Sequence, residues 1–185
     1  MKPKILFILH LPPPIHGAAM MGKYIQESEL VNSSFDCFCI NLATAGSLSD
    51  IGHISLKKLL KYFFLLKHIS HVVREIRPEL VYITPNAGGK AFFKDFIVVQ
   101  MLKSMGCKVI AHYHNKGVSV YQSKWVYNFF YKRFFSNLKV ILLAENLYKD
   151  IAKYVKREDV YICPNGIPNL RKVEFEARRK NEVPY

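Results

Sequence analysis

Two histidines, His112 and His114, and the neighbouring Asn115 end an apolar run and carry side chains that can take part in chemistry. Alternation along a strand places both histidines on the same side, and we expect neither to lie fully inside a core because the strand ends there. A histidine at such a position can hydrogen-bond a hydroxyl or a phosphate, or exchange a proton near neutral pH. The alternative is one packed and one solvated histidine. No third ligand follows at a suitable spacing, so no metal is expected.

A second candidate site is the turn at residues 12–19, where three prolines lead into His16, Gly17 and Ala18. Small residues open a predicted helix there, so a ligand could approach the backbone closely. The start of a helix offers unpaired N–H groups and a partial positive charge, which suit a phosphate or a sugar hydroxyl. One glycine does not make the glycine pattern of a dinucleotide site. The alternative is a tight turn with no ligand.

Polar residues also follow three other predicted strands. Asn86 stands before the pair Gly88-Gly89, Glu145 follows the fifth apolar run, and Asn165-Gly166 makes a sharp turn after the last one. In a parallel sheet the carboxyl ends of the strands form the ligand-binding edge. We therefore expect all these loops, together with residues 43–54, to border one cleft.

The elements that would position these loops alternate along the chain. Apolar runs predict buried strands, and apolar residues at helical spacing predict the helices between them. Alternating strands and helices predict an α/β fold, a three-layer Rossmann-like domain with a parallel sheet of about six strands and helices on both faces. The expected strands are residues 4–11, 35–42, 80–84, 108–113, 139–144 and 160–163, and the expected helices are 17–28, 55–76, 91–105, 124–135 and 147–155.

The 185-residue chain carries a net charge of +13, which predicts attraction to nucleic acid, anionic lipid or phosphorylated small molecules. Two predicted helices mix basic and large apolar residues in a way that suits an anionic bilayer surface, although most of these aromatics could belong to an ordinary core. No apolar run reaches the length of a membrane span, so we expect a cytoplasmic protein, peripheral at the inner face of the plasma membrane. The expected membrane-facing residues are Lys57, Lys61, Phe64, Lys124, Trp125, Lys132 and Arg133.

The four cysteines form no Cys-x-x-Cys pair, and no histidine stands at ligand spacing from them. Buried reduced thiols are therefore the expectation, and neither a zinc site nor a bound cofactor is predicted.

Five stretches together resemble the N-terminal domain of family four glycosyltransferases of the GT-B fold. They extend from Lys2 to about Pro168, and the last of them is the most specific. His16 stands where that family usually has the first of two glycines. The stretches are KILFILHL at residues 4–11, HGAA at 16–19, IRPELVYITP at 76–85, KVIAHYHN at 108–115 and DVYICPNGIP at 159–168.

The resemblance implies a retaining transfer of a sugar from a nucleotide-sugar donor to a glycan or lipid-linked acceptor. Residues 1–170 would be the acceptor-binding domain, and 171–185 a linker towards a C-terminal domain that carries the paired glutamates and most of the donor site. It also implies that Gly17 lies near the donor phosphates and sugar, and that His114, the expected catalytic residue, lines the cleft near the transferred sugar. A chain without the second domain would fold but not catalyse.

Two other functions fit parts of the sequence. A nucleic-acid-binding module would use the basic surface, but the chain has no recognisable RNA- or DNA-binding motif and its aromatics fall in helices rather than on a sheet face. A flavodoxin-like or response-type binding domain would share the fold, but the acidic cluster and phosphate loop of such proteins are missing. We expect a sugar or glycan acceptor rather than nucleic acid as the partner.

Overall fold

The computed structural model describes residues 1–42 and 56–166, in which six parallel strands form a single sheet. The strand order is β2-β1-β3-β4-β5-β6, so β1 has a neighbour on each side and the direction of winding reverses between β1 and β3. The predicted α/β class with an all-parallel sheet is confirmed. The strands are β1 (Lys4–Leu9), β2 (Asp36–Asn41), β3 (Leu80–Ile83), β4 (Val109–Tyr113), β5 (Lys139–Leu142) and β6 (Val160–Ile162).

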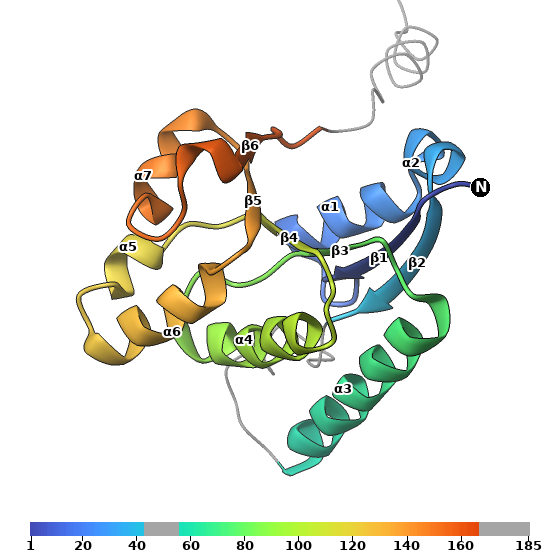
Figure 1. Ribbon diagram of the computed structural model, residues 1–185, viewed down its shortest axis with the longest axis horizontal. Helices are drawn as coiled ribbons and strands as arrows, with labels where there is room; N and C mark the ends of the chain where they lie inside the picture. Colours follow the sequence, from blue (N-terminus) through green and yellow to red (C-terminus); the bar gives the residue numbers. More distant parts are fainter. Residues whose placement is uncertain (43–55, 167–185) are drawn as a thin grey trace, which may run out of the picture.

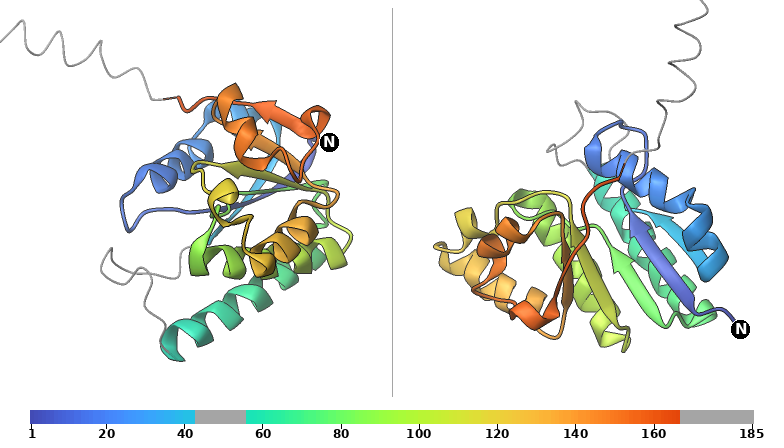
Figure 2. Two further views of the ribbon diagram at one scale, coloured as in Figure 1. Left: turned by 90° about the vertical axis from the view of Figure 1, so that its left-hand side faces the viewer. Right: turned by 90° about the horizontal axis from the view of Figure 1, so that it is seen from above.

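Helices cover both faces of the sheet, as the three-layer prediction requires. Figures 1 and 2 show α1 and α2 on one face and α3, α4 and α6 on the other. The helices are α1 (Gly17–Gln26), α2 (Glu29–Ser34), α3 (Leu56–Ile76), α4 (Gly89–Ser104), α5 (Val118–Tyr121), α6 (Trp125–Phe135) and α7 (Tyr148–Ile151), with short 3₁₀ turns η2 (Glu145–Leu147) and η3 (Arg157–Asp159).

Strand alternation divides the core into two hydrophobic clusters, one on each face. The smaller cluster lies under α1 and α2 and is built on Ile5, Phe7 and Leu9 of β1. The larger one lies under α3, α4 and α6 and takes in alternate residues of β3, β4 and β5. Because β1 is buried on both faces, its near-continuous apolar sequence is that of a central parallel strand.

Several predicted boundaries are wrong in informative ways. The first predicted helix ends at Gln26, and a separate α2 begins after Ser28, whose hydroxyl accepts the Val31 N–H at 3.3 Å. The helix predicted at 147–155 is only one turn, α7, preceded by η2. The loop predicted at 43–54 and the linker predicted at 171–185 lie outside the described residues.

The apolar spacing of α3 correctly predicts a helix but not how the helix is covered. Leu56, Leu59 and Phe63 belong to that spacing, yet they are exposed, whereas Ile69, Val73 and Ile76 are buried in the larger cluster. Figure 1 shows the beginning of α3 standing away from the sheet. Only the second half of α3 therefore covers the sheet. None of the helices in 1–42 and 56–166 is long and apolar enough to cross a membrane.

Candidate functional site

The loops after β1, β3 and β4 meet at the carboxyl edge of the sheet, where the winding direction reverses. β1 pairs with β3, and β3 pairs with β4, so the three loops are neighbours in space. His16 and His114, which belong to two different predicted sites, both lie near enough to His10 for their charges to lower its pKa. The structure thus brings the glycine-bearing turn and the histidine-bearing turn to one edge, as the sequence predicts for such a sheet.

His10 is the first residue after β1 and joins this edge to β3. Its backbone N–H donates to Thr84 Oγ1 at 3.3 Å, and its ring Nδ1 lies 3.4 Å from the same oxygen. Burial, followed by the charges of Lys94 and His16, lowers the pKa of His10 to about 4. His10 is therefore neutral at physiological pH.

His16 is the N-cap of α1, and its ring Nδ1 accepts the Ala19 N–H at 3.3 Å. The rings of His10 and His16 are 6.1 Å apart, centroid to centroid. Gly17 is exposed beside them, and a methyl group placed on its Cα would touch nothing within 4 Å, so the backbone at the helix start is open on that side. Ala18 lies half-buried in the first turn of α1.

His112 is buried, with only 4% of its surface exposed, so the expectation that neither strand histidine lies in the core is wrong for this residue. It lies on the face of β4 that also carries Tyr82 of β3, and the Tyr82 hydroxyl hydrogen-bonds its Nδ1. Burial and the neighbouring His114 lower the pKa of His112 to about 3. The neighbouring strand supplies a polar partner, which is why a histidine is tolerated there.

His114 is half-buried, and its Nδ1 lies 3.1 Å from Asn165 Oδ1. Because a carbonyl oxygen only accepts, Nδ1 carries the proton, which leaves a lone pair on Nε2 in the neutral ring. Nε2 is shielded and has no hydrogen-bond partner, and the same is true of His112 Nε2. Burial lowers the pKa of His114, and the His112 and His114 rings lie 4.2 Å apart. Nε2 is thus an unpaired but covered acceptor, and a ligand hydroxyl would reach it only after the covering groups move.

The loop after β3 is fixed from three sides. Asp95 of α4 is fully buried and accepts both the backbone and the side-chain N–H of Asn86 at 2.8 Å. Asn115 Oδ1 accepts the Ala87 N–H at 3.2 Å, and the Tyr131 hydroxyl donates to the Ala87 carbonyl at 2.6 Å. Asn86 and Asn115 thus both help to hold this loop, and Asn115 is exposed as well.

One of the predicted site residues, Glu145, is not brought into this group. Glu145 forms a two-pronged ion pair with Arg157, at 2.8 and 2.7 Å, on the exposed surface after β5. Gly166 is exposed and directly follows Asn165, the partner of His114. Within the described ranges no three His, Cys, Asp or Glu side chains are close enough together to hold a metal ion.

The electrostatics of the edge differ from those of the whole chain. The chain carries +13, but the pKa values of His10, His112 and His114 are all lowered, so three imidazoles at the edge are neutral. Lys94 is the cation that perturbs His10, and its ammonium group already donates to the Leu42 carbonyl at 3.1 Å. Neutral rings with one free nitrogen bind hydroxyl groups by hydrogen bonds rather than holding a polyanion by charge.

Sequence reasoning missed four residues that shape this edge. His10 and Thr84 are polar residues at the ends of apolar strands, which is a usable signal for a residue at a sheet edge. Lys94 and Asp95 fall inside an aromatic helix, where nothing local shows that Asp95 is buried or that Lys94 reaches Leu42. Comparison of the sequence with protein-family models and with curated proteins found no match.

Proposed function

We propose that the chain is the acceptor-binding half of a retaining glycosyltransferase that uses a nucleotide-sugar donor. The sugar is transferred to a glycan or lipid-linked acceptor at the carboxyl edge of the sheet. The chain alone is inactive in this proposal, because a second domain supplies most of the donor site. No metal and no bound cofactor are required of these residues.

The observation that carries the proposal is that the loops after β1 and β4, which carry Gly17 and His114, end at one edge of the sheet on either side of β3, where the strand order reverses. The open helix start at Gly17 suits the donor phosphates, since backbone N–H groups and the helix dipole favour an anion there. The unpaired Nε2 of His114 would suit a sugar hydroxyl once the groups that cover it move. One end of the site thus favours an anion and the other favours a neutral polyol, which matches the two parts of a nucleotide-sugar.

His112 and Asn165 act on His114 rather than on a substrate. Asn165 Oδ1 holds the proton on Nδ1 of His114, and the His112 ring packs against the same imidazole at 4.2 Å. The neutral state of His114 matters because a protonated ring would offer a donor in place of the acceptor. These contacts hold the ring in place and leave the lone pair on Nε2.

The test is a transfer assay on the product of the complete reading frame that contains this chain. The protein is incubated with a panel of uridine- and guanosine-diphosphate sugars, and release of nucleoside diphosphate is measured with and without membrane lipid extracts as acceptor. We expect turnover of at least one donor, and loss of that turnover in His114→Ala. A reading frame without a second α/β domain bearing two spaced glutamates would overturn the proposal.

A further inference from the structure

We propose that the outer surface of α3, α4 and α6 is a docking face for an anionic lipid bilayer. This surface lies on the opposite side of the sheet from α1 and α2 (Figure 1). α4 contacts both α3 and α6, so the two segments that the sequence marks separately as basic and aromatic belong to one continuous helix layer. The inference does not depend on the proposed transfer of a sugar.

The first half of α3 exposes a row of large apolar side chains. Leu56, Leu59, Leu60, Phe63 and Phe64 are each between 52% and 75% exposed. The helix is nevertheless tied to its neighbour, because the Tyr62 hydroxyl donates to the Lys94 carbonyl of α4 at 2.6 Å. Water-exposed leucine and phenylalanine at such density need a partner that covers them.

Contacts between aromatic rings make the apolar surface continuous from α4 to α6. Phe130 of α6 packs against Phe93 and Phe96 of α4 with ring centroids 5.3 and 4.8 Å apart. Phe129 lies beside Phe130 on the outer side, and Trp125 at the start of α6 is 80% exposed. Indole and phenyl rings at the rim of such a face are suited to the boundary between headgroups and acyl chains.

Charge on this layer is almost entirely of one sign. The three helices carry ten Lys and Arg residues, of which Lys94 and Lys103 donate to backbone carbonyls of other segments. They carry only two carboxylates, and one of these, Asp95, is buried. Lys67 lies over the Phe63 ring at 5.8 Å, and Arg133 lies over the Phe129 ring at 5.9 Å. Cations with their stems along exposed rings can reach headgroup phosphates while the rings enter the bilayer.

Other occupants fit this surface less well. A second copy of the chain on the same face would bring two strongly basic surfaces together, and protein interfaces are depleted in lysine at their centre. Nucleic acid would match the charge and could stack on the exposed rings, but it would leave the exposed leucines of α3 uncovered. An anionic bilayer matches both the charge and the aliphatic side chains.

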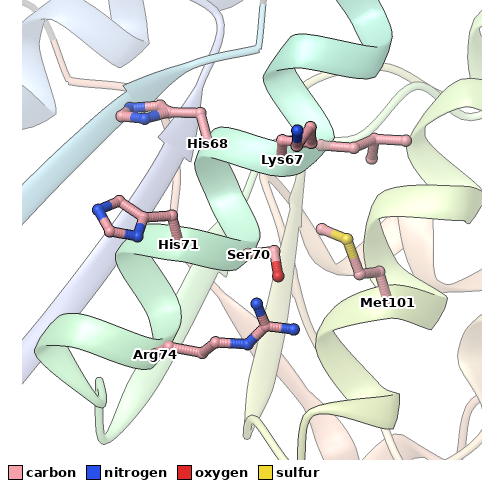
Figure 3. Close-up of a pocket in the computed structure, with 7 residues that line it drawn as sticks. Lys67, His68, Ser70, His71, Arg74 and Met101 are labelled. Atoms are coloured by element: carbon pink, nitrogen blue, oxygen red, sulfur yellow. The ribbon is translucent and has the colours of Figure 1, made fainter.

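A groove between α3 and α4 adds a place for a headgroup beside the apolar row. It has a volume of about 620 Å³, lies away from the carboxyl edge of the sheet, and has an apolar floor of Leu66 and Met101. Figure 3 shows Ser70 and Arg74 turned toward α4, with His68 and His71 on the other side of α3. A hydroxyl and a guanidinium turned the same way are a suitable pair for a phosphate oxygen.

The test is sedimentation of the 185-residue chain with vesicles of pure phosphatidylcholine, and with vesicles that also contain phosphatidylglycerol. We expect binding at least about tenfold tighter to the anionic vesicles, and weaker binding as salt is raised, since exposed charges are screened. Phe63→Ser/Phe64→Ser and Lys61→Glu/Lys67→Glu should each weaken binding at least about tenfold, because each removes one of the two attractions.

The matched controls lie on the opposite face. Leu30→Ser on α2, where Leu30 is 77% exposed, and Lys23→Glu on α1 should leave vesicle binding unchanged. The thermal midpoint of every variant is measured. If Phe63→Ser/Phe64→Ser does not fold, vesicle binding by Lys61→Glu/Lys67→Glu decides the test. Equal binding to both kinds of vesicle, equal loss in the controls, or preference for an oligonucleotide over anionic vesicles would overturn the proposal.

Discussion

At the scale of single residues, substitution of His114 distinguishes a role in ligand binding from a role in packing. In the proposed two-domain glycosyltransferase, His114→Ala should lower turnover by about 10- to 100-fold, the loss expected for one hydrogen bond to a reacting sugar. The free energy of unfolding should fall by about 1 kcal/mol or less, because the side chain is only half-buried. Steady-state rates and urea denaturation measure the two effects. A large loss of stability with unchanged turnover would make His114 a packing residue.

Asp95, in contrast, is a buried polar residue that stabilises the fold through its hydrogen bonds to Asn86. Asp95→Ala should destabilise the protein by about 3–5 kcal/mol, because two N–H groups of Asn86 lose their acceptor and the buried site loses its polar partner. Asp95→Asn keeps one carbonyl oxygen for Asn86 and should lose less. Urea denaturation of both variants gives the comparison, and equal losses in the two would contradict the assigned hydrogen bonds.

At the scale of elements, two glycines of α1 allow a requirement for folding to be distinguished from a requirement for ligand binding. A Cβ on Gly22 would lie 2.2 Å from the His10 carbonyl oxygen, so α1 can cross the end of β1 only without a side chain there. Gly22→Ala should cost about 1–3 kcal/mol of stability, since backbone must move to relieve the contact. Gly17→Ala meets no atom and should change stability by about 0.5 kcal/mol or less.

The same glycine pair tests the proposed donor site. If phosphates approach the start of α1, a methyl group at Gly17 should raise the KM for the nucleotide-sugar in the complete enzyme while stability stays normal. Thermal unfolding and substrate titration of both variants supply the measurements. An unchanged KM in Gly17→Ala would remove Gly17 from the site.

The elements also show which parts of the structure the sequence could predict. Apolar spacing was enough to predict all six strands and the parallel class, because buried parallel strands are continuous apolar runs. It could not predict that Leu59 and Phe63 are exposed, since spacing reports an apolar face and not what covers it. The burial of Asp95 and the close approach at Gly22 depend on partners from other elements, so neither has a local signal.

At the scale of the whole molecule, charge and apolar surface are separated from the ligand edge. The basic residues of α3, α4 and α6, apart from Lys94 beside His10, lie on the helix layer that exposes leucines and phenylalanines, whereas the edge after β1, β3 and β4 carries neutral imidazoles. If both proposals hold, the protein docks through one surface and binds its substrate at another. Variants of α3 should therefore affect vesicle binding without changing turnover on a water-soluble acceptor analogue.

The neutral histidines also make the stability of the whole fold depend on pH. The ordinary pKa of histidine is 6.5, and burial lowers the pKa to about 4 for His10 and about 3 for His112. Above pH 6.5 both states of the protein hold these rings neutral. Below it the unfolded chain takes up the protons and the folded chain does not, so the free energy of unfolding falls as pH falls.

The loss should approach about 1.4 kcal/mol per pH unit for each fully buried histidine, until the folded-state pKa is reached. Urea denaturation of the wild type and of His112→Gln at several values between pH 7.5 and 4.5 measures it. Glutamine does not titrate and its carbonyl oxygen can still accept from Tyr82, so its slope should be shallower. The raised pKa of Asp95 acts in the opposite direction in both proteins and cancels in the difference. Parallel slopes would mean that the His112 ring takes up its proton in the folded state as readily as in the unfolded one.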